Sequence, residues 1–386
     1  MKSSKQPVKG FNDWTGQEAK KREQIKEILK KNFRLYGFEP AETPIIESRD
    51  FVVGDNGEDE AVSDTYKLTD KGNRELALRY EFTFQLERIA KNKKLPYKRY
   101  QLGPVFRDEP TSGNRYRQFT QCDVDIVGST KREEAEILAL TSKILNELGI
   151  EFSIKFNNRK LLNEILEEED VKKEDREEVI RVIDKLDKKK EKEFKKELKK
   201  YGCESILKIF KKEEEYFEKY KAYEEIAELE DYCESYGIEI NFLPSLARGL
   251  SYYNGSVYEV KTKEMNETIT AGGSFMVNNR QATGISFGLE RLKDLATIET
   301  KDKDVLILSI GQDDEAIELA EKLRDEDIKC ELYYDKVSKA LEYADSKNIE
   351  YVIFVGEEEL PKFKLKKMES GDEDILEEKG LVEELN

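Results

Sequence analysis

Residues 103–109 have the sequence GPVFRDE and residues 115–121 have the sequence RYRQFTQ, with a short polar loop between them. Two such runs on either side of a polar loop predict a pair of antiparallel strands. Arginines stand in both runs, and guanidinium groups suit phosphate oxygens because they offer fixed pairs of donors and keep their charge. Phe119 lies among polar residues, where its ring could stack on a base. The alternative is an exposed hairpin with surface ion pairs.

A second informative stretch, LARGLSYYNG, covers residues 246–255. Arg248 is followed by a glycine and then by a pair of tyrosines, which suggests a strand end where the backbone approaches a ligand closely. The alternative is that Tyr252 and Tyr253 are simply a core pair.

Two further stretches are candidates for ligand contacts. AGGSF (residues 271–275) and GISFGLERL (residues 284–292) predict a glycine-lined strand that runs into a helix, with Arg291 in its first turns beside free backbone N–H groups that favour an anion. In LRYEFT (residues 78–83), Glu81 and Thr83 are predicted to share one face of a strand, where they would suit a ligand ammonium group. The alternative for that last stretch is an ordinary strand with a polar face.

Composition restricts the possible chemistry. The chain has 386 residues and no histidine, which excludes Ser-His-Asp and Cys-His catalysis, His-ligated zinc and an imidazole acid–base catalyst. An enzyme of this composition would work with carboxylates, guanidinium or ammonium groups, tyrosines, a bound metal or position alone. The net charge of −17 argues against nucleic-acid binding by overall charge, although local basic stripes remain possible.

The cellular setting is predicted from what the sequence lacks. The four cysteines show no CxxC spacing, the N-terminus has no apolar signal region, and no apolar run approaches the length of a membrane span. We therefore expect a cytoplasmic protein with no membrane partner.

The length predicts two or three domains. Apolar periodicity predicts a helix over residues 17–36, ended by Gly37, and another over residues 132–148. Lys/Glu-rich sequence over about 159–236 predicts an inserted helical segment with a solvated face. From Val305 onward, strands alternate with helices, which predicts a small α/β domain with mainly parallel strands after a linker over residues 300–303.

The order of these motifs resembles the histidyl-tRNA synthetase family of class II aminoacyl-tRNA synthetases over nearly the whole chain. The resemblance begins at KGFNDW (residues 9–14) and includes the first class motif around Pro44. It continues through LRYEFT, the second motif FRDE…RYRQFTQ, the histidine-specific ARGLSYYNGSVYE and the third motif GLERL, and ends at KKMESGD (residues 366–372).

The resemblance implies an α+β class II catalytic domain, in which an antiparallel sheet is flanked by helices, with a helical insertion and a C-terminal α/β anticodon-binding domain. The implied divisions are residues 1–157 and 237–299 for the catalytic core, 158–236 for the insertion and 303–386 for the anticodon-binding domain. It also implies a homodimer in which the Pro44 regions of two subunits face each other.

The implied reaction joins L-histidine to ATP, giving histidyl-adenylate and pyrophosphate, and then transfers histidine to the 3′ end of tRNA-His. Arg107 and Arg248 would grip the α-phosphate and act as the catalytic residues. Four residues would complete the ATP site, with Mg²⁺ held through the phosphates rather than by protein side chains: Glu109, Arg115, Phe119 and Arg291. The carboxylate nucleophile needs no general base, so the reaction is compatible with a chain that lacks histidine.

The histidine-binding residues implied by the resemblance form two groups. The substrate α-amino group would contact Glu81, Thr83 and Gln121. The imidazole nitrogens would contact Asp125, Tyr253 and Tyr252.

Three features depart from the family pattern. Many members have the longer glutamate at the position of Asp125. The family usually continues Arg-Tyr-Asp after the two glycines, whereas residues 274–276 here are Ser-Phe-Met in a shortened loop. The loop over residues 110–114, which relatives often use on the tRNA acceptor end, has no basic residue.

Two other functions fit parts of this pattern. A non-catalytic paralogue would act as a histidine sensor or as a regulatory subunit of histidine biosynthesis, but such relatives typically lose the phosphate-gripping arginines and the anticodon-binding domain. A class II synthetase of different specificity is disfavoured by ARGLSYY.

Overall fold

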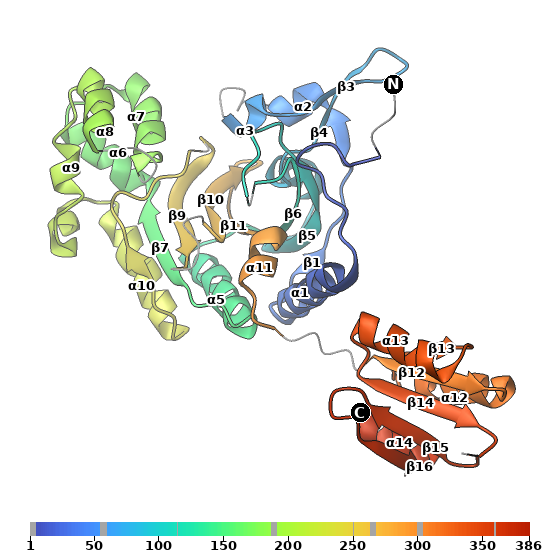
Figure 1. Ribbon diagram of the computed structural model, residues 1–386. Coiled ribbons are helices and arrows are strands. Elements are labelled where there is room, and N and C mark those ends of the chain that lie inside the picture. The colour runs from blue at the N-terminus through green and yellow to red at the C-terminus, as the bar shows by residue number, and fades with distance from the viewer. Residues whose placement is uncertain are drawn as a thin grey trace. The chain divides into compact units, whose positions relative to one another are not determined.

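The computed structural model describes residues 5–54, 60–113, 115–186, 191–249, 251–262, 268–298, 304–358 and 360–386. The chain forms two compact units, residues 1–298 and 299–386 (Figure 1). The linker predicted over residues 300–303 lies outside the described residues. The finer division of the first unit at residues 157 and 236 stays a prediction.

The first unit is built on an eight-stranded sheet with the order β1-β5-β6-β11-β10-β9-β7-β8. The pairs from β5 to β7 are antiparallel, and only the two edge strands pair in parallel. This confirms the antiparallel sheet of the expected class II fold. The strands are β1 (Glu39–Pro40), β5 (Tyr97–Phe106), β6 (Gln118–Val127), β7 (Ser153–Asn158), β8 (Asn241–Phe242), β9 (Tyr253–Lys261), β10 (Thr270–Val277) and β11 (Arg280–Gly288).

Helices α1 (Gly16–Leu35), α5 (Lys131–Glu147) and α11 (Leu289–Leu295) pack together and onto this sheet. Both long helices were predicted within one or two residues, and Gly37 follows α1 with the positive φ of +79° that suits a glycine at a helix end. Along β6, Cys122, Val124 and Ile126 belong to the core shared with these helices. Since side chains alternate along a strand, the polar residues between them face the other side of the sheet.

Two antiparallel strand pairs of this sheet carry the predicted ligand motifs. Strands β5 and β6 pair continuously from Tyr97↔Val127 to Phe106↔Gln118, which confirms the predicted pair of strands. Strands β10 and β11 are joined by Asn278 and Asn279, whose φ angles of 50° and 60° match a two-residue hairpin turn. The expectation that residues 274–276 lie in a shortened loop is therefore wrong, because they belong to β10 and pair with β11, and the connection itself is the tight turn at Asn278 and Asn279.

One expectation is wrong: Glu81 and Thr83 do not lie on a strand. A second, three-stranded sheet has the order β2-β4-β3, and β4 ends at Leu78. Thr83–Gln85 forms a 3₁₀ turn that continues into helix α4 (Leu86–Ile89). Burial of Phe82 and Leu86, which lie four residues apart, favours this helical path over a strand. The remaining elements here are β2 (Ile46–Ser48), β3 (Lys67–Thr69), β4 (Glu75–Leu78), α2 (Arg49–Val53) and α3 (Glu60–Ser63).

The Lys/Glu-rich segment is helical, as predicted. Its α-helices are α6 (Arg159–Glu168), α7 (Arg176–Ile183), α8 (Glu191–Leu198), α9 (Ile206–Ile209) and α10 (Tyr223–Ser235), with 3₁₀ turns at Lys173–Asp175, Lys199–Tyr201 and Glu214–Lys219. Helix α6 packs on β9, and α10 packs on α5 and β7. The first and last helices of the segment therefore share the core of the sheet.

The second unit confirms the predicted α/β alternation, with five strands in the order β13-β12-β14-β15-β16. The first three pair in parallel and the last two pairs are antiparallel. Its elements are β12 (Val305–Ile310), α12 (Asp313–Asp325), β13 (Cys330–Tyr333), α13 (Val337–Lys347), β14 (Tyr351–Gly356), β15 (Phe363–Lys367), β16 (Glu373–Leu376) and α14 (Glu378–Leu385).

No helix in the described ranges is both long enough and apolar enough to cross a bilayer.

Candidate active site

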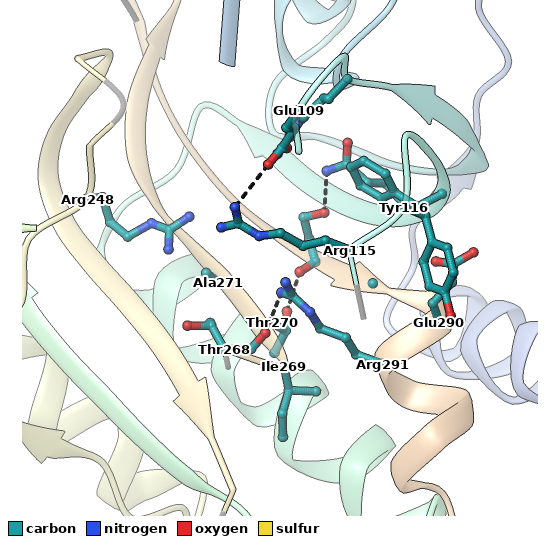
Figure 2. Close-up of a pocket in the computed structure, with 15 residues that line it drawn as sticks. Glu109, Arg115, Tyr116, Arg248, Thr268, Ile269, Thr270, Ala271, Glu290 and Arg291 are labelled. Carbon is teal, nitrogen blue, oxygen red and sulfur yellow. Dashed lines mark hydrogen bonds and ion pairs between the residues drawn. The ribbon is translucent and has the colours of Figure 1, made fainter. Parts of the chain in front are cut away.

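A cavity lies against the polar face of the large sheet, between the β5–β6 connection, β10, β11 and the start of α11 (Figure 2). All the residues that were predicted for the ATP site line it: Arg107, Glu109, Arg115, Phe119, Arg248 and Arg291. Figure 2 shows Arg115, Arg248 and Arg291 reaching toward one space from three separate elements. Four guanidinium groups around one cavity suit a ligand with several negative charges.

Glu109 partly neutralises the cavity arginines. Its carboxylate lies 3.3 Å from Nη1 of Arg115 and 3.9 Å from Nη1 of Arg107. Arg107 also donates from Nε to the carbonyl of Tyr80 at 3.2 Å and lies 5.2 Å from the ring centre of Phe119. A bound polyphosphate would therefore compete with Glu109 for both arginines, and an adenine on Phe119 would compete with Arg107 for the ring.

The strand–helix junction has the predicted architecture, because β11 ends at Gly288 and α11 starts at Leu289. Arg291 donates to the carbonyl of Thr268 at 2.6 Å. The carboxylate of the neighbouring Glu290 accepts hydrogen bonds from the backbone N–H of Thr120 at 3.1 Å and from the guanidinium of Arg22 at 3.0 Å. Glu290 therefore fixes the junction to β6 and α1. Neither Glu290 nor Arg22 was singled out in the sequence.

Arg248 stands on a loop that ends where β9 begins, and Leu250 of its motif lies outside the described residues. Its guanidinium lies 3.6 Å from Glu259, and its carbonyl accepts a hydrogen bond of 3.0 Å from the buried Arg159 at the start of α6. A Cβ atom at Gly249 would lie 2.9 Å from the carboxylate of Asp184, just beyond α7. The close neighbour of this glycine is thus a side chain of the helical segment.

The predicted amino-acid subsite uses the same face of the sheet. Only Gln121 of its residues lines the cavity itself. Glycines 273 and 284 are cross-strand partners on β10 and β11. A Cβ atom at Gly284 would lie 2.2 Å from Oδ1 of Asp125, and one at Gly273 would lie 2.8 Å from the ring of Tyr253. One pair of glycines therefore makes room for Asp125 and Tyr253, two of the three side chains that were predicted to contact the imidazole.

Tyr252 and Tyr253 are also a packed pair, with ring centres 4.6 Å apart. Tyr252 packs edge-on against Phe275, so the residue that replaces the family's tyrosine supports the wall of the subsite. Burial is the main cause that raises the pKa of both phenols, which keeps them protonated and able to donate.

Glu81 and Thr83 lie on the connection after β4. Glu81 is buried, and its charge helps raise the pKa values of Asp123, Tyr252 and Tyr253, which places it near all three. Thr83 starts the 3₁₀ turn and is half-buried.

A fully buried arginine that was not predicted supports Asp125. Arg99 on β5 is directly opposite Asp125 in the β5–β6 pair, and its Nη2 lies 2.8 Å from Oδ2 of Asp125. Burial raises the pKa of Asp125 to about 6, and Arg99 limits that rise. The signal that could have identified the pair is strand register, which places residues 99 and 125 opposite each other only once the hairpin is aligned.

Asp123 is a second carboxyl group that was missed. It lies between Gln121 and Asp125 on β6, and its Oδ1 accepts a hydrogen bond of 2.5 Å from Oγ of Ser286 on β11. Burial, followed by the charge of Asp125, raises the pKa of Asp123 to about 8. Simple alternation along QCDVD (residues 121–125) would have placed Asp123 on the predicted ligand face.

Among the residues that the structure describes, no group of three or more Cys, Asp or Glu side chains is placed to hold a metal ion. A magnesium ion held through ATP phosphates remains the prediction.

Comparisons with known proteins agree with this architecture. Residues 10–292 match the family model for histidyl-tRNA synthetase, and residues 304–386 match the model for an anticodon binding domain. The chain is 34% identical to a protein named histidine–tRNA ligase 1 from Bacillus cereus, over 92% of each chain.

Two solved structures share the fold. A histidyl-tRNA synthetase from Nostoc sp. PCC 7120 superposes with a TM-score of 0.86 at 23% identity, over 100% of this chain and 99% of that one. A structure from Bacillus halodurans C, described as an ATP phosphoribosyltransferase regulatory subunit/histidyl-tRNA synthetase, gives 0.76 at 20% identity, over 92% and 99%. From its motifs, its antiparallel sheet and these matches, the chain belongs to the histidyl-tRNA synthetase family.

Proposed function

We propose that this protein is a histidine–tRNA ligase that forms histidyl-adenylate from L-histidine and ATP and then transfers histidine to tRNA-His. The observation that carries the proposal is the convergence of Arg107, Arg115, Arg248 and Arg291 on one cavity beside a subsite that holds Asp125 and Tyr253. The cavity suits a polyphosphate, and the subsite suits an imidazole, because a carboxylate and a phenol can satisfy its two nitrogens.

In the first step, the histidine carboxylate attacks the α-phosphorus of ATP, and pyrophosphate leaves with the electrons of the broken P–O bond. Arg107 and Arg248 would bind the α-phosphate from two sides and stabilise the charge on five-coordinate phosphorus. Mg²⁺ would supply additional charge stabilisation at the β- and γ-phosphates. The remaining work is alignment, so no imidazole base is needed.

The other ATP contacts follow from the ion pairs of the cavity. Arg115 and Arg291 would bind the β- and γ-phosphates, and Phe119 and Arg291 would enclose the adenine. When the phosphates replace Glu109 as partners of Arg107 and Arg115, the Glu109 carboxylate is free to accept a hydrogen bond from the adenine amino group.

In the second step, a terminal ribose hydroxyl of tRNA-His attacks the histidyl carbonyl, and AMP leaves. The match of residues 304–386 to an anticodon binding domain supports tRNA as the partner. We place this activity in the cytoplasm, where tRNA is charged.

We also propose a homodimer through the segment around Pro44. Ile45 and Ile46, which follow this proline, are 40% and 48% exposed in the single chain. Adjacent apolar side chains at the expected two-fold interface would be covered by the partner subunit.

The regulatory paralogue is not favoured. All four arginines are present and line the cavity, and the similar Bacillus cereus protein bears the name histidine–tRNA ligase 1. The Bacillus halodurans structure shares the fold alone at 20% identity.

The test is histidine-dependent ATP–pyrophosphate exchange in the presence of magnesium. We expect exchange by the wild type, and a loss on the order of 100- to 1,000-fold in Arg248→Ala, because one charge-stabilising group at phosphorus is removed. Arg280 lies at the start of β11, at the opposite end of the strand from Gly288, which lines the cavity. Arg280→Ala is therefore the matched arginine control and should keep wild-type exchange. Absence of exchange in the wild type would overturn the activity, and full exchange in Arg248→Ala would overturn the role of Arg248.

A further inference from the structure

Three side chains form a hydrogen-bond chain across β6 and β11, beneath the cavity. Gln121 donates from Nε2 to Oγ of Ser286 at 2.7 Å, and Ser286 donates from its hydroxyl to Oδ1 of Asp123 at 2.5 Å. Gln121 and Ser286 line the cavity, whereas Asp123 is only 4% exposed and lies behind them. The three residues therefore connect the cavity to a buried carboxyl group.

The chemistry of the carboxyl group sets the direction of this chain. Oδ1 of Asp123 is an acceptor in the carboxylate and in a carboxyl group that is protonated on Oδ2. In the structure Ser286 supplies its single hydroxyl hydrogen to Oδ1 of Asp123, which leaves only lone pairs on its oxygen for Gln121. The amide of Gln121 then turns its NH₂ group toward Ser286, because that oxygen can only accept a further hydrogen bond.

This orientation leaves the amide oxygen of Gln121 for a ligand. Oε1 of Gln121 is buried and has no hydrogen-bond partner among the described residues. A buried acceptor without a partner is costly, so a donor that enters the cavity gains a prepared contact. The donor available in the proposed reaction is the α-ammonium group of histidine, which the nearby carboxylate of Glu81 also attracts.

We propose that Ser286 and Asp123 are positioning residues that fix the amide of Gln121 with its oxygen toward the substrate ammonium group. The inference rests on the proposed function, because it assigns a supporting role within the amino-acid subsite. Neither residue is itself required to touch the substrate; both act through Gln121.

Two ligands isolate the ammonium contact: L-histidine and 3-(imidazol-4-yl)propionate, which differ by the amino group alone. In pyrophosphate exchange, Ser286→Ala and Asp123→Ala should each raise the KM for histidine about tenfold, because the amide is free to turn its NH₂ group toward the ammonium. The Ki of 3-(imidazol-4-yl)propionate and the KM for ATP should stay within about twofold of wild type. The double variant should add little to either single change, since the two residues serve one chain of hydrogen bonds.

Two variants separate positioning from general damage. Asp123→Asn keeps an acceptor oxygen for Ser286, so its KM for histidine should stay close to the wild-type value. Ser274→Ala removes a matched hydrogen bond of 2.5 Å, from a serine on β10 to the buried Glu134, and should leave the KM for histidine unchanged.

The possible failures are distinguishable. No exchange by the wild type would refute the proposed function itself. If the wild type is active, an unchanged KM for histidine in Ser286→Ala would overturn the positioning role. Equal weakening of histidine and 3-(imidazol-4-yl)propionate would also overturn it, as would an Asp123→Asn variant as impaired as Asp123→Ala.

Discussion

The floor and the Arg248 wall of the candidate active site are supported in different ways. The floor consists of side chains on β6 and β11, which are paired over seven residues from Gln121↔Gly288 to Val127↔Ala282. The wall is a loop before β9, in which the carbonyl of Arg248 accepts a hydrogen bond from Arg159 of the helical segment and the guanidinium of Arg248 pairs with Glu259 on β9. The floor is fixed by strand register, whereas the wall depends on side-chain contacts, one of which comes from outside the sheet.

This difference predicts different kinetic effects. Changes to the floor should weaken binding of the amino acid, because the floor presents the predicted histidine contacts. Changes to the support of the wall should slow adenylate formation, because Arg248 is predicted to act on charge that develops at phosphorus.

Among the variants that compare the floor with the support of the wall, the largest effect is expected from an added methyl group in the floor. In Gly284→Ala, the new Cβ atom would lie 2.2 Å from Oδ1 of Asp125 and 3.0 Å from the carbonyl of Val124. Asp125 must move and loses its buried ion pair with Arg99, which should cost about 3 kcal/mol of stability. We expect the KM for histidine to rise on the order of 100-fold in pyrophosphate exchange.

The control for this prediction is a methyl group on the same strand with space around it. At Gly288, the nearest atom to a new Cβ is the flexible side chain of Arg291 at 3.8 Å. Gly288→Ala should therefore keep the wild-type urea midpoint. A Gly284→Ala variant of normal stability and normal KM for histidine would contradict the arrangement of the floor.

The wall can be tested through Arg159, which donates to the carbonyl of Arg248 and pairs with Glu177 on α7. In Arg159→Gln the carbonyl loses this partner and the loop loses its tie to the helical segment. We expect kcat for exchange to fall about tenfold with the KM for histidine nearly unchanged, because the loss is confined to the transition state.

Arg176 provides a matched control within the same helical segment. It donates to the carbonyl of Val171 at 3.1 Å and pairs with Glu167 at 3.1 Å, and both of these partners lie outside the Arg248 loop. Arg176→Gln should therefore keep the wild-type kcat. An equal loss of kcat in both variants would mean that general loosening of the helical segment, rather than the Arg248 contact, controls the rate.

The predictable parts of this molecule carry local, repeating signals. Helix α1, helix α5 and the alternating elements from Val305 to Tyr351 follow from apolar periodicity and glycine positions. The ATP-site arginines were predicted together because the motif resemblance gives their order, and the cavity contains all of them.

The missed parts depend on contacts between distant segments. The Arg99–Asp125 pair requires the register of two strands, and the Arg159–Arg248 contact joins segments separated by 89 positions. The strand predicted at Glu81 and Thr83 is wrong because burial of Phe82 and Leu86 bends the chain into a helical turn there. Asp123 could have been found, since it lies on the same strand face as two predicted residues.

The smallest predicted effect concerns the pH dependence of stability and sharpens the description of the floor. The folded pKa of Asp123, about 8, is raised above its ordinary value of 3.8 by burial and by Asp125. The stabilisation that its bound proton provides is complete below pH 4 and is lost as pH rises through 8. Groups that influence Asp123 are Asp125 on β6, Arg99 on β5, Ser286 on β11, and Glu81 and Arg79 after β4.

Asp123→Asn removes this titration and keeps the shape of the side chain. Between pH 7 and pH 9, where Asp125 with a pKa of about 6 is already ionised, the wild type should lose about 1 kcal/mol more stability than the variant. Urea denaturation of both proteins at the two pH values measures the difference. Parallel losses would show that Asp123 does not titrate between pH 7 and pH 9, which would contradict a folded pKa of about 8.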